Sequence, residues 1–129
     1  MPTLTMAPTL GDLVKYELNG SYNRETVTLK AGTSYPLGAV LGRITASGKY
    51  RLSPASPVTG DEGAETAVAV LIAAVDATAG DAAGLVIARG PAIVSKAALA
   101  FDASVDQPAE KAAKHAELAA IGIVPRETA

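Results

Sequence analysis

The chain has 129 residues, a formal net charge of −2 and no cysteine. This length is typical of one domain that is large enough to bury its own core. The lack of cysteine excludes disulfides, thiolate ligands and thiol nucleophiles, and the lack of a basic run argues against a nucleic-acid partner. The N-terminus lacks the charged and apolar regions of a signal peptide, and no apolar run approaches the ~20 residues of a membrane helix, so we expect no membrane partner and synthesis in a cytoplasm.

The apolar residues are mostly small. They make up 49% of the chain, but the chain contains one Phe, four Tyr and no Trp. A core of small aliphatic side chains gives modest burial per residue, at about 25 cal/mol per Å² of apolar area. Association of subunits is therefore expected as a second source of stability.

Residues 1–20 differ from the rest of the chain. Prolines and glycines interrupt the segment, and its apolar residues are too scattered to predict a core element. Two interpretations stay open, a frayed terminus and an arm that adds as a strand to another protein, for which the alternating residues 3–6 are suited. The candidate contact residues of such an arm are Thr3, Leu4, Thr5, Met6, Leu10, Leu13 and Val14.

Strand patterns begin after the arm, in a predicted β-rich domain over residues 21–129. Residues 24–29 alternate polar and apolar side chains and predict a half-exposed strand. Residues 36–44 predict a strand bent at Gly38 and Gly42, because glycine inside a strand marks a bend or a close backbone approach. A turn at Ser47 and Gly48 then leads into a returning strand over residues 49–52.

The apolar run of residues 67–75 is the centre of the predicted core. It is followed by turn residues from Asp76 to Asp81 and by a second apolar run over residues 85–91. Each run has the length of one buried strand. We expect the two to pair as neighbouring antiparallel strands.

Two groups of acidic residues are candidate sites. Asp61, Glu62 and Glu65 lack the spaced oxygen ligands of a calcium loop, which favours an exposed acidic turn. Asp76 and Asp81 allow a carboxylate pair for acid–base catalysis, but the residues between them are turn formers, and aspartate itself favours turns. The turn interpretation is favoured for both.

One helix is predicted over residues 107–121. Asp106 is its candidate N-cap, Pro108 suits its first turn, and Gly122 suits its end. Alanines at helical spacing are expected to pack on a sheet or on a neighbouring subunit; they are Ala109, Ala112, Ala113, Ala116, Ala119 and Ala120. His115, the single histidine, has no second histidine or cysteine to share a metal, so a solvated position is expected.

Shorter elements flank this helix. Ser95 is expected to cap a helical turn over residues 96–101, and residues 121–125 predict a final strand. No Gly-x-Ser-x-Gly elbow, phosphate loop or dinucleotide loop occurs. Composition and pattern together predict a small, mainly β protein that is not an enzyme and carries no cofactor or metal.

The order of these segments resembles the head decoration protein family of tailed bacteriophages, the family of the lambda capsid-stabilising protein. The resemblance spans residues 22–126 and depends on spacing rather than on one motif. The segments that carry it are residues 24–28, 31–32, 36–43, 47–50, 66–71, 76–81, 89–91 and 119–124.

The resemblance implies a bent-ribbon, β-clip-like fold with short helices that assembles as a homotrimer. Family trimers sit on the outside of the expanded head at three-fold and quasi-three-fold positions. There they clamp the major capsid protein against the pressure of packaged DNA. The N-terminal arm, expected to be flexible in the free trimer, would order as an added strand on the capsid protein.

Two other classes stay open as alternatives. One is a trimeric tail or baseplate β-module, which would occur in few copies per virion. The other is a small-molecule-binding protein or a hydrolase that uses Asp76 and Asp81. We rank the decoration protein first and the enzyme last.

Overall fold

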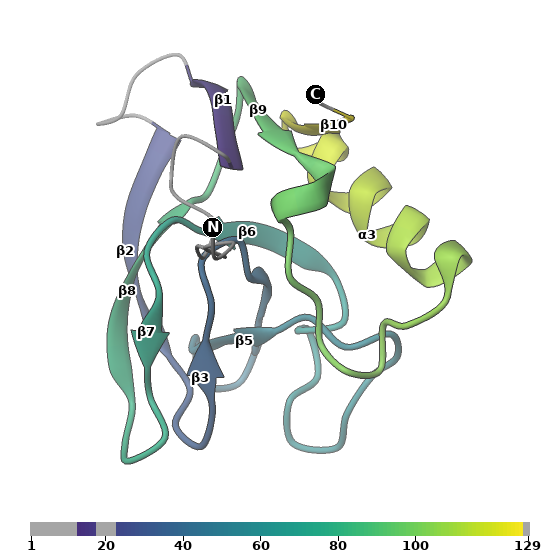
Figure 1. Ribbon diagram of the computed structural model, residues 1–129. Coiled ribbons are helices and arrows are strands. Elements are labelled where there is room, and N and C mark those ends of the chain that lie inside the picture. Colours follow the sequence, from purple (N-terminus) through teal and green to yellow (C-terminus); the bar gives the residue numbers. More distant parts are fainter. Residues whose placement is uncertain (1–12, 18–22, 128–129) are drawn as a thin grey trace, which may run out of the picture.

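The computed structural model describes residues 13–17 and 23–127, and it is built mainly of β-strands (Figure 1). The predicted mainly β fold with short helices is confirmed. The elements are β1 (Val14–Glu17), β2 (Arg24–Leu29), β3 (Ser34–Tyr35), β4 (Val40–Arg43), β5 (Tyr50–Leu52), β6 (Ala67–Leu71), β7 (Val75–Asp76), β8 (Ala82–Ile87), β9 (Ala92–Ser95), the 3-10 turn η1 (Lys96–Ala98), α3 (Pro108–Ala120) and β10 (Ile123–Arg126).

The described strands form a barrel and two smaller sheets. The barrel closes in the order β2-β5-β4-β6-β8, while β1-β9-β10 form a three-stranded sheet and β3-β7 a two-stranded ribbon. Figure 1 shows α3 beside β9 and β10, at the end of the molecule away from the tip of the β3–β7 ribbon. The fold therefore places one helix and one small sheet against one side of a barrel.

The predicted pairing of the two central runs is confirmed, but the first run is shorter than predicted. Strands β6 and β8 are antiparallel, with Val70 opposite Ile87 and Leu71 opposite Val86. The run does not continue to Val75 as one strand, because Ala73 and Ala74 leave the core and are exposed. Residues 75–76 then form β7, which pairs with β3.

Strands β4 and β6 and the last two residues of β8 are buried on both faces. Successive residues of a strand point to opposite faces. Val40, Val70 and Ile87 pack with α3 and the β1-β9-β10 sheet, while their neighbours Leu41, Leu71 and Val86 pack inside the barrel. These strands separate two cores, which explains why their sequences are continuous apolar runs without polar alternation.

Glycine marks close backbone approach at the two predicted positions. A Cβ on Gly42 would overlap the carbonyl oxygen of Ala64, and a Cβ on Gly38 would overlap that of Ala98. Gly38 also has φ of 86°, which favours glycine. The turn at Gly38 is the reason why β4 begins at Val40 instead of residue 36.

Helix α3 matches the predicted helix to within one residue at each end. Its N-cap is Gln107 instead of the predicted Asp106, and the carboxylate of Glu110 accepts a hydrogen bond from the Gln107 N–H at 3.2 Å. Gly122 ends the helix with φ of 85°, as expected. No helix in the described part of the chain is long and apolar enough to cross a membrane.

The six alanines of α3 are all exposed in the single chain, because Lys114 and Leu118 form the buried face. Packing of these alanines on a sheet of the same chain is therefore wrong, while packing on a neighbouring subunit stays a prediction. The expected cap at Ser95 is also wrong. The turn after Ser95 is a 3-10 turn of three residues, and the Ser95 side chain makes no cap hydrogen bond.

The prediction that residues 1–20 contain no core element is wrong for residues 13–17. Leu13 is fully buried in the core shared with α3. Strand β1 pairs antiparallel with β9, with Val14 opposite Val94. A register shift between Val14 and Tyr16 interrupts the regular pairing of β1 with β9.

The close approach of Gly42 to the Ala64 backbone predicts that adding one methyl group at residue 42 destabilises the fold strongly. Gly42→Ala should lower the free energy of unfolding by about 1–3 kcal/mol or more, because backbone must move to make room. Gly80→Ala is the matched control, since its Cβ would meet nothing within 4 Å. Urea unfolding of both variants measures the difference, and equal stability would contradict the close packing of β4 on residue 64.

Candidate functional site

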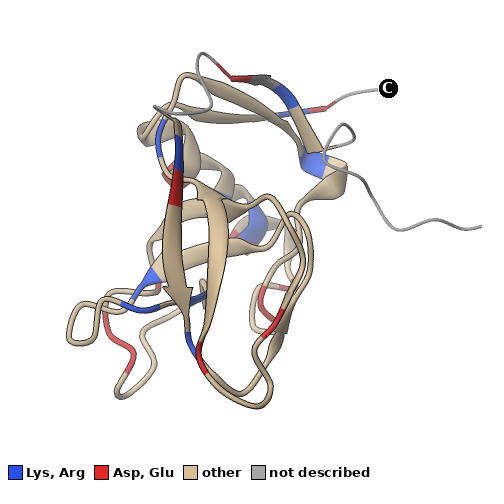
Figure 2. Ribbon diagram, turned by 90° about the vertical axis from the view of Figure 1, so that its left-hand side faces the viewer, with Lys and Arg blue, Asp and Glu red and all other residues tan. Residues whose placement is uncertain are grey.

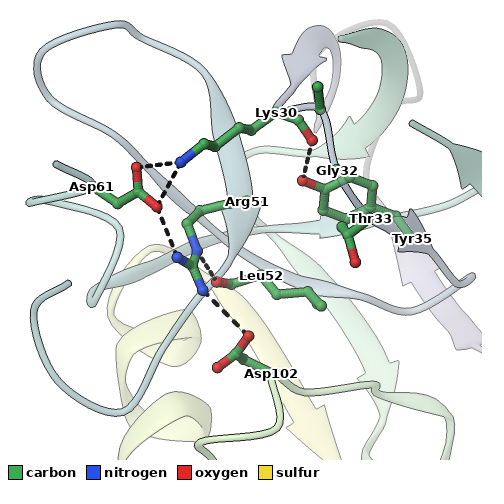
Figure 3. A pocket seen from close by; sticks show the side chains of 9 residues that line it. Lys30, Gly32, Thr33, Tyr35, Arg51, Leu52, Asp61 and Asp102 are labelled. Atoms are coloured by element: carbon green, nitrogen blue, oxygen red, sulfur yellow. Dashed lines mark hydrogen bonds and ion pairs between the residues drawn. The ribbon is translucent and has the colours of Figure 1, made fainter. Parts of the chain in front are cut away.

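A pocket of about 200 Å³ opens beside the barrel, where β2, β3 and β5 meet two loops (Figure 3). Its lining is a mixture of charged, aromatic and backbone groups. The residues are Lys30, Ala31, Gly32, Thr33, Tyr35, Arg51, Leu52, Asp61 and Asp102. The chemistry of this pocket depends on how its two cations and two carboxylates are paired.

Asp61 is the centre of the polar network. Its carboxylate accepts hydrogen bonds from Lys30 Nζ at 2.7 and 2.9 Å and from Arg51 Nη1 at 2.8 Å. The residue is only 5% exposed, so the predicted exposed acidic turn is wrong for Asp61, although Glu62 is exposed. The paired cations compensate for burial of the charge.

Arg51 extends this network across three segments. Its Nε donates to the Leu52 carbonyl at 2.9 Å, and its Nη2 donates to Asp102 Oδ1 at 3.3 Å. Asp102 in turn accepts from the Ser104 N–H at 3.1 Å and from its hydroxyl at 2.6 Å. Strand β5, the loop of Asp61 and the segment before α3 are thereby joined.

The protonation states in the pocket follow from these contacts. The hydrogen bond from Lys30 is the main cause that lowers the pKa of Asp61, and Arg51 lowers it further. Burial raises the pKa of Tyr35, whose hydroxyl donates to the Lys30 carbonyl at 2.7 Å. The ionised carboxylate of Asp61, which accepts three hydrogen bonds, and the neutral phenol of Tyr35 hold the segments together. Neither group has a pKa near neutral pH, as acid–base catalysis would require.

Asp76 and Asp81 act as turn residues, as the favoured interpretation predicted. Asp76 Oδ1 accepts from the N–H and the hydroxyl of Thr78 at 3.0 and 2.7 Å. Asp81 accepts from the Ala31 N–H at 2.8 Å and pairs with Lys49 at 2.6 Å. The bond from Thr78 lowers the pKa of Asp76, and that from Lys49 lowers the pKa of Asp81. Each carboxylate is engaged locally.

His115 is not in the solvated position that the sequence predicted. The residue is half-buried, and its ring packs edge-to-face on Phe101 with centroids 5.7 Å apart. Over residues 13–17 and 23–127, no group of three histidine, cysteine, aspartate or glutamate side chains is arranged to hold a metal ion.

Lys114 is a structural residue that the sequence analysis missed. It is 2% exposed, and its ammonium donates to the carbonyls of Pro54, at 2.7 Å, and Glu65. Glu117, one helical turn away, accepts from the Ala67 N–H at 2.9 Å. Two charged side chains thus attach α3 to the loop before β6. A lysine among alanines gives no sequence signal for this, because charged helix residues are usually exposed.

The predicted arm residues fall into two groups. Thr3, Leu4, Thr5, Met6 and Leu10 lie outside the described residues. Of the other two, Leu13 is buried in the core and Val14 is half-buried at the start of β1. The structure therefore anchors the chain at Leu13, with twelve residues preceding it.

Charges on the described surface are mixed. Figure 2 shows acidic and basic residues distributed over several elements, with neither sign gathered on one face. Several of them pair across elements, among them Arg24 with Glu17 at 2.5 Å and Arg89 with Glu25 at 3.0 Å. Mixed charges of this kind, on the part of the chain that the structure describes, do not favour the steering of a strongly charged ligand.

The fold and the polar network together define a β-rich structural domain, in which the charged groups serve to fix loops and the helix. A family model gives this domain its identity. Residues 3–123 match the bacteriophage lambda head decoration protein D family, and the chain belongs to that family. No curated protein matches the chain with significance. Membership implies a structural role in a phage capsid, in association with that capsid.

Removal of the Asp61 charge tests the network. Asp61→Asn should lower the free energy of unfolding at pH 7 by about 1–3 kcal/mol, because two cations lose their partner. The pKa of Asp61 is lower in the folded state, so its contribution is present above the ordinary aspartate pKa and is lost as pH falls through the native value.

Urea unfolding at pH 7 and pH 3 measures this difference. The difference in the free energy of unfolding between wild type and Asp61→Asn should be smaller at pH 3 than at pH 7. Asp76→Asn is the control, because the Asp76 side chain is exposed and its carboxylate accepts its described hydrogen bonds from Thr78 of the same turn. An equal loss in both variants would refute the special role of Asp61.

The buried ammonium gives a second prediction. Lys114→Met should lower the free energy of unfolding by about 1–3 kcal/mol, because the carbonyls of Pro54 and Glu65 lose their charged donor. Lys111→Met on the exposed side of the same helix loses a 5.9 Å contact with the Phe101 ring, and should cost about 0.5–1 kcal/mol or less. Thermal unfolding distinguishes the two; similar values would show that Lys114 is not an anchor.

Proposed function

We propose that this protein binds as a homotrimer to the outer surface of the expanded phage head, at three-fold and quasi-three-fold positions, and stabilises the head against the pressure of packaged DNA. The observation that carries the proposal is the family match over residues 3–123. The predicted partners are two further copies of the chain and the major capsid protein, with no nucleic acid, membrane or cofactor required.

Residues 1–12 are the proposed capsid-binding arm. They precede the buried Leu13 directly, so the arm is attached to the core at a fixed point. Twelve extended residues span about 40 Å at ~3.3 Å each, which is long enough to reach a neighbouring subunit of a shell. The alternation of residues 3–6 suits strand addition, in which backbone hydrogen bonds supply affinity and alternate side chains supply specificity.

A trimer would make weak arm contacts effective. Three arms held together face three nearby sites, so the second and third contacts form at high effective concentration. A shell that presents these sites only after expansion would then be bound late and selectively. Equal binding to unexpanded and expanded heads would contradict this part of the proposal.

Deletion of residues 1–12 tests the arm. The shortened chain should keep its fold, since the deletion stops before Leu13 and β1. It should no longer co-sediment with expanded heads that lack the protein, whereas the full-length chain should bind saturably at about one copy per capsid subunit. Binding by both would move the contact away from the arm, and binding by neither would favour a tail or baseplate module.

A point variant distinguishes strand addition from side-chain contact. Thr5→Pro removes a backbone N–H, and Thr5→Ala keeps it. If residues 3–6 pair as a strand, Thr5→Pro should weaken head binding by roughly a hundredfold, since a loss of about 1 kcal/mol recurs in each of three arms. Thr5→Ala should bind nearly as well as wild type. Equal binding by both variants would contradict pairing at this residue.

Sedimentation equilibrium tests the trimer directly. Full-length protein and the chain lacking residues 1–12 should both sediment at three times their chain masses, the full-length chain being 12.9 kDa. A monomer in both samples would contradict the homotrimer, and a trimer only in the full-length sample would place the arm at the subunit interface.

A further inference from the structure

His115 occupies an unusual position on α3. Its ring packs on Phe101 with an interplanar angle of 61°. The Nε2 atom is buried, and among the described residues it has no hydrogen-bond partner. A buried polar atom without a partner is unfavourable, and the cost is larger when the ring carries a charge.

The charged groups that act on this ring are both basic. Lys96 of η1 and Lys111 of α3 lower the pKa of His115, in addition to the larger effect of burial. The charges that act on the ring include no carboxylate. On the adjoining segments, Asp102 bonds Arg51 and Ser104, Glu110 bonds the Gln107 N–H and Glu117 bonds the Ala67 N–H, while Asp106 is exposed before the start of α3. A proton on His115 therefore adds a third positive charge without a compensating carboxylate.

We propose that His115 is an acid-sensitive latch, which in its neutral form holds α3 against residues 96–101 and on protonation releases this contact. The opened state returns the imidazolium to water and separates it from Lys96. The proposal is independent of the capsid role, because it concerns contacts within one subunit.

The direction of the pH effect follows from the lowered pKa of His115. The neutral ring contributes its full stability above the ordinary histidine pKa of about 6.5, and the contribution is lost as pH falls towards the native value. His115 is the only histidine in the chain, and carboxyl groups ordinarily titrate near pH 4. Between pH 7.5 and 5.5 the loss of protection should therefore be confined to α3 and residues 96–101.

One titration measures the latch on the intact protein. The single histidine gives one pair of imidazole C–H signals, Hδ2 and Hε1, in the proton NMR spectrum, so its midpoint can be assigned without mutation. Amide exchange of α3 is followed over the same pH range and corrected for the intrinsic pH dependence of exchange. We expect a titration midpoint below 6.5. The protection of the α3 amides should fall over the same pH range, and the largest fall is tenfold for each unit by which the pKa of His115 is higher in the open state than in the closed state.

Two variants provide the controls. His115→Gln cannot gain the proton, so its α3 protection should not fall between pH 7.5 and 5.5. Joint replacement of Lys96 and Lys111 by Gln keeps the histidine, and should raise its midpoint towards 6.5 and reduce the loss. A wild-type midpoint at or above 6.5, unchanged α3 protection in the wild type, or an equal loss in His115→Gln would each overturn the proposal.

Discussion

The fold depends on one constraint, which is that β4, β6 and the end of β8 are buried on both faces. Val70 and Leu71 are adjacent in sequence but pack in different cores. Apolar side chains must therefore occupy successive positions, and small residues are needed where backbone approaches, as at Gly42. With one Phe and no Trp in the chain, burial comes from many small contacts, so correct packing of these strands matters more than any single large side chain.

Charged groups then hold the outer segments to this barrel. Asp61, paired with Lys30 and Arg51, fixes the loop before β6 to the ends of β2 and β5. Lys114 attaches α3 to the same loop, because its ammonium donates to the carbonyls of Pro54 and Glu65 in that loop. The loop is therefore held from the barrel side and from the helix side. Such buried pairs add little net stability over apolar replacements, but they are costly to break once one partner is removed.

Much of the fold was predictable because its signals are local. The pairing of the central runs, the turns at Asp76 and Asp81 and the end of α3 at Gly122 follow from periodicity and turn chemistry. Errors arose where tertiary contacts decide the outcome. The burial of Asp61 depends on cations 31 and 10 residues away, and that of Lys114 depends on carbonyls 60 and 49 residues away. The exposed alanine face of α3 follows from the same anchor, since Lys114 turns the other face inward. Of the predicted arm, Leu13 is instead the anchor of the chain in the core.

Leu13 connects this scaffold to the proposed capsid-binding arm, because the chain enters the core there. From Leu13 on, the described residues form a domain that the barrel, the loop network and α3 hold together, and residues 1–12 are the proposed arm. The most direct test is a cryo-electron microscopy reconstruction of expanded heads saturated with the full-length protein. The account predicts three copies around each three-fold and quasi-three-fold position on the outer surface, with density for residues 1–12 continuing from Leu13 as a strand on the capsid protein. Density for the protein elsewhere in the virion, or contacts made by the barrel with no strand from residues 1–12, would contradict it.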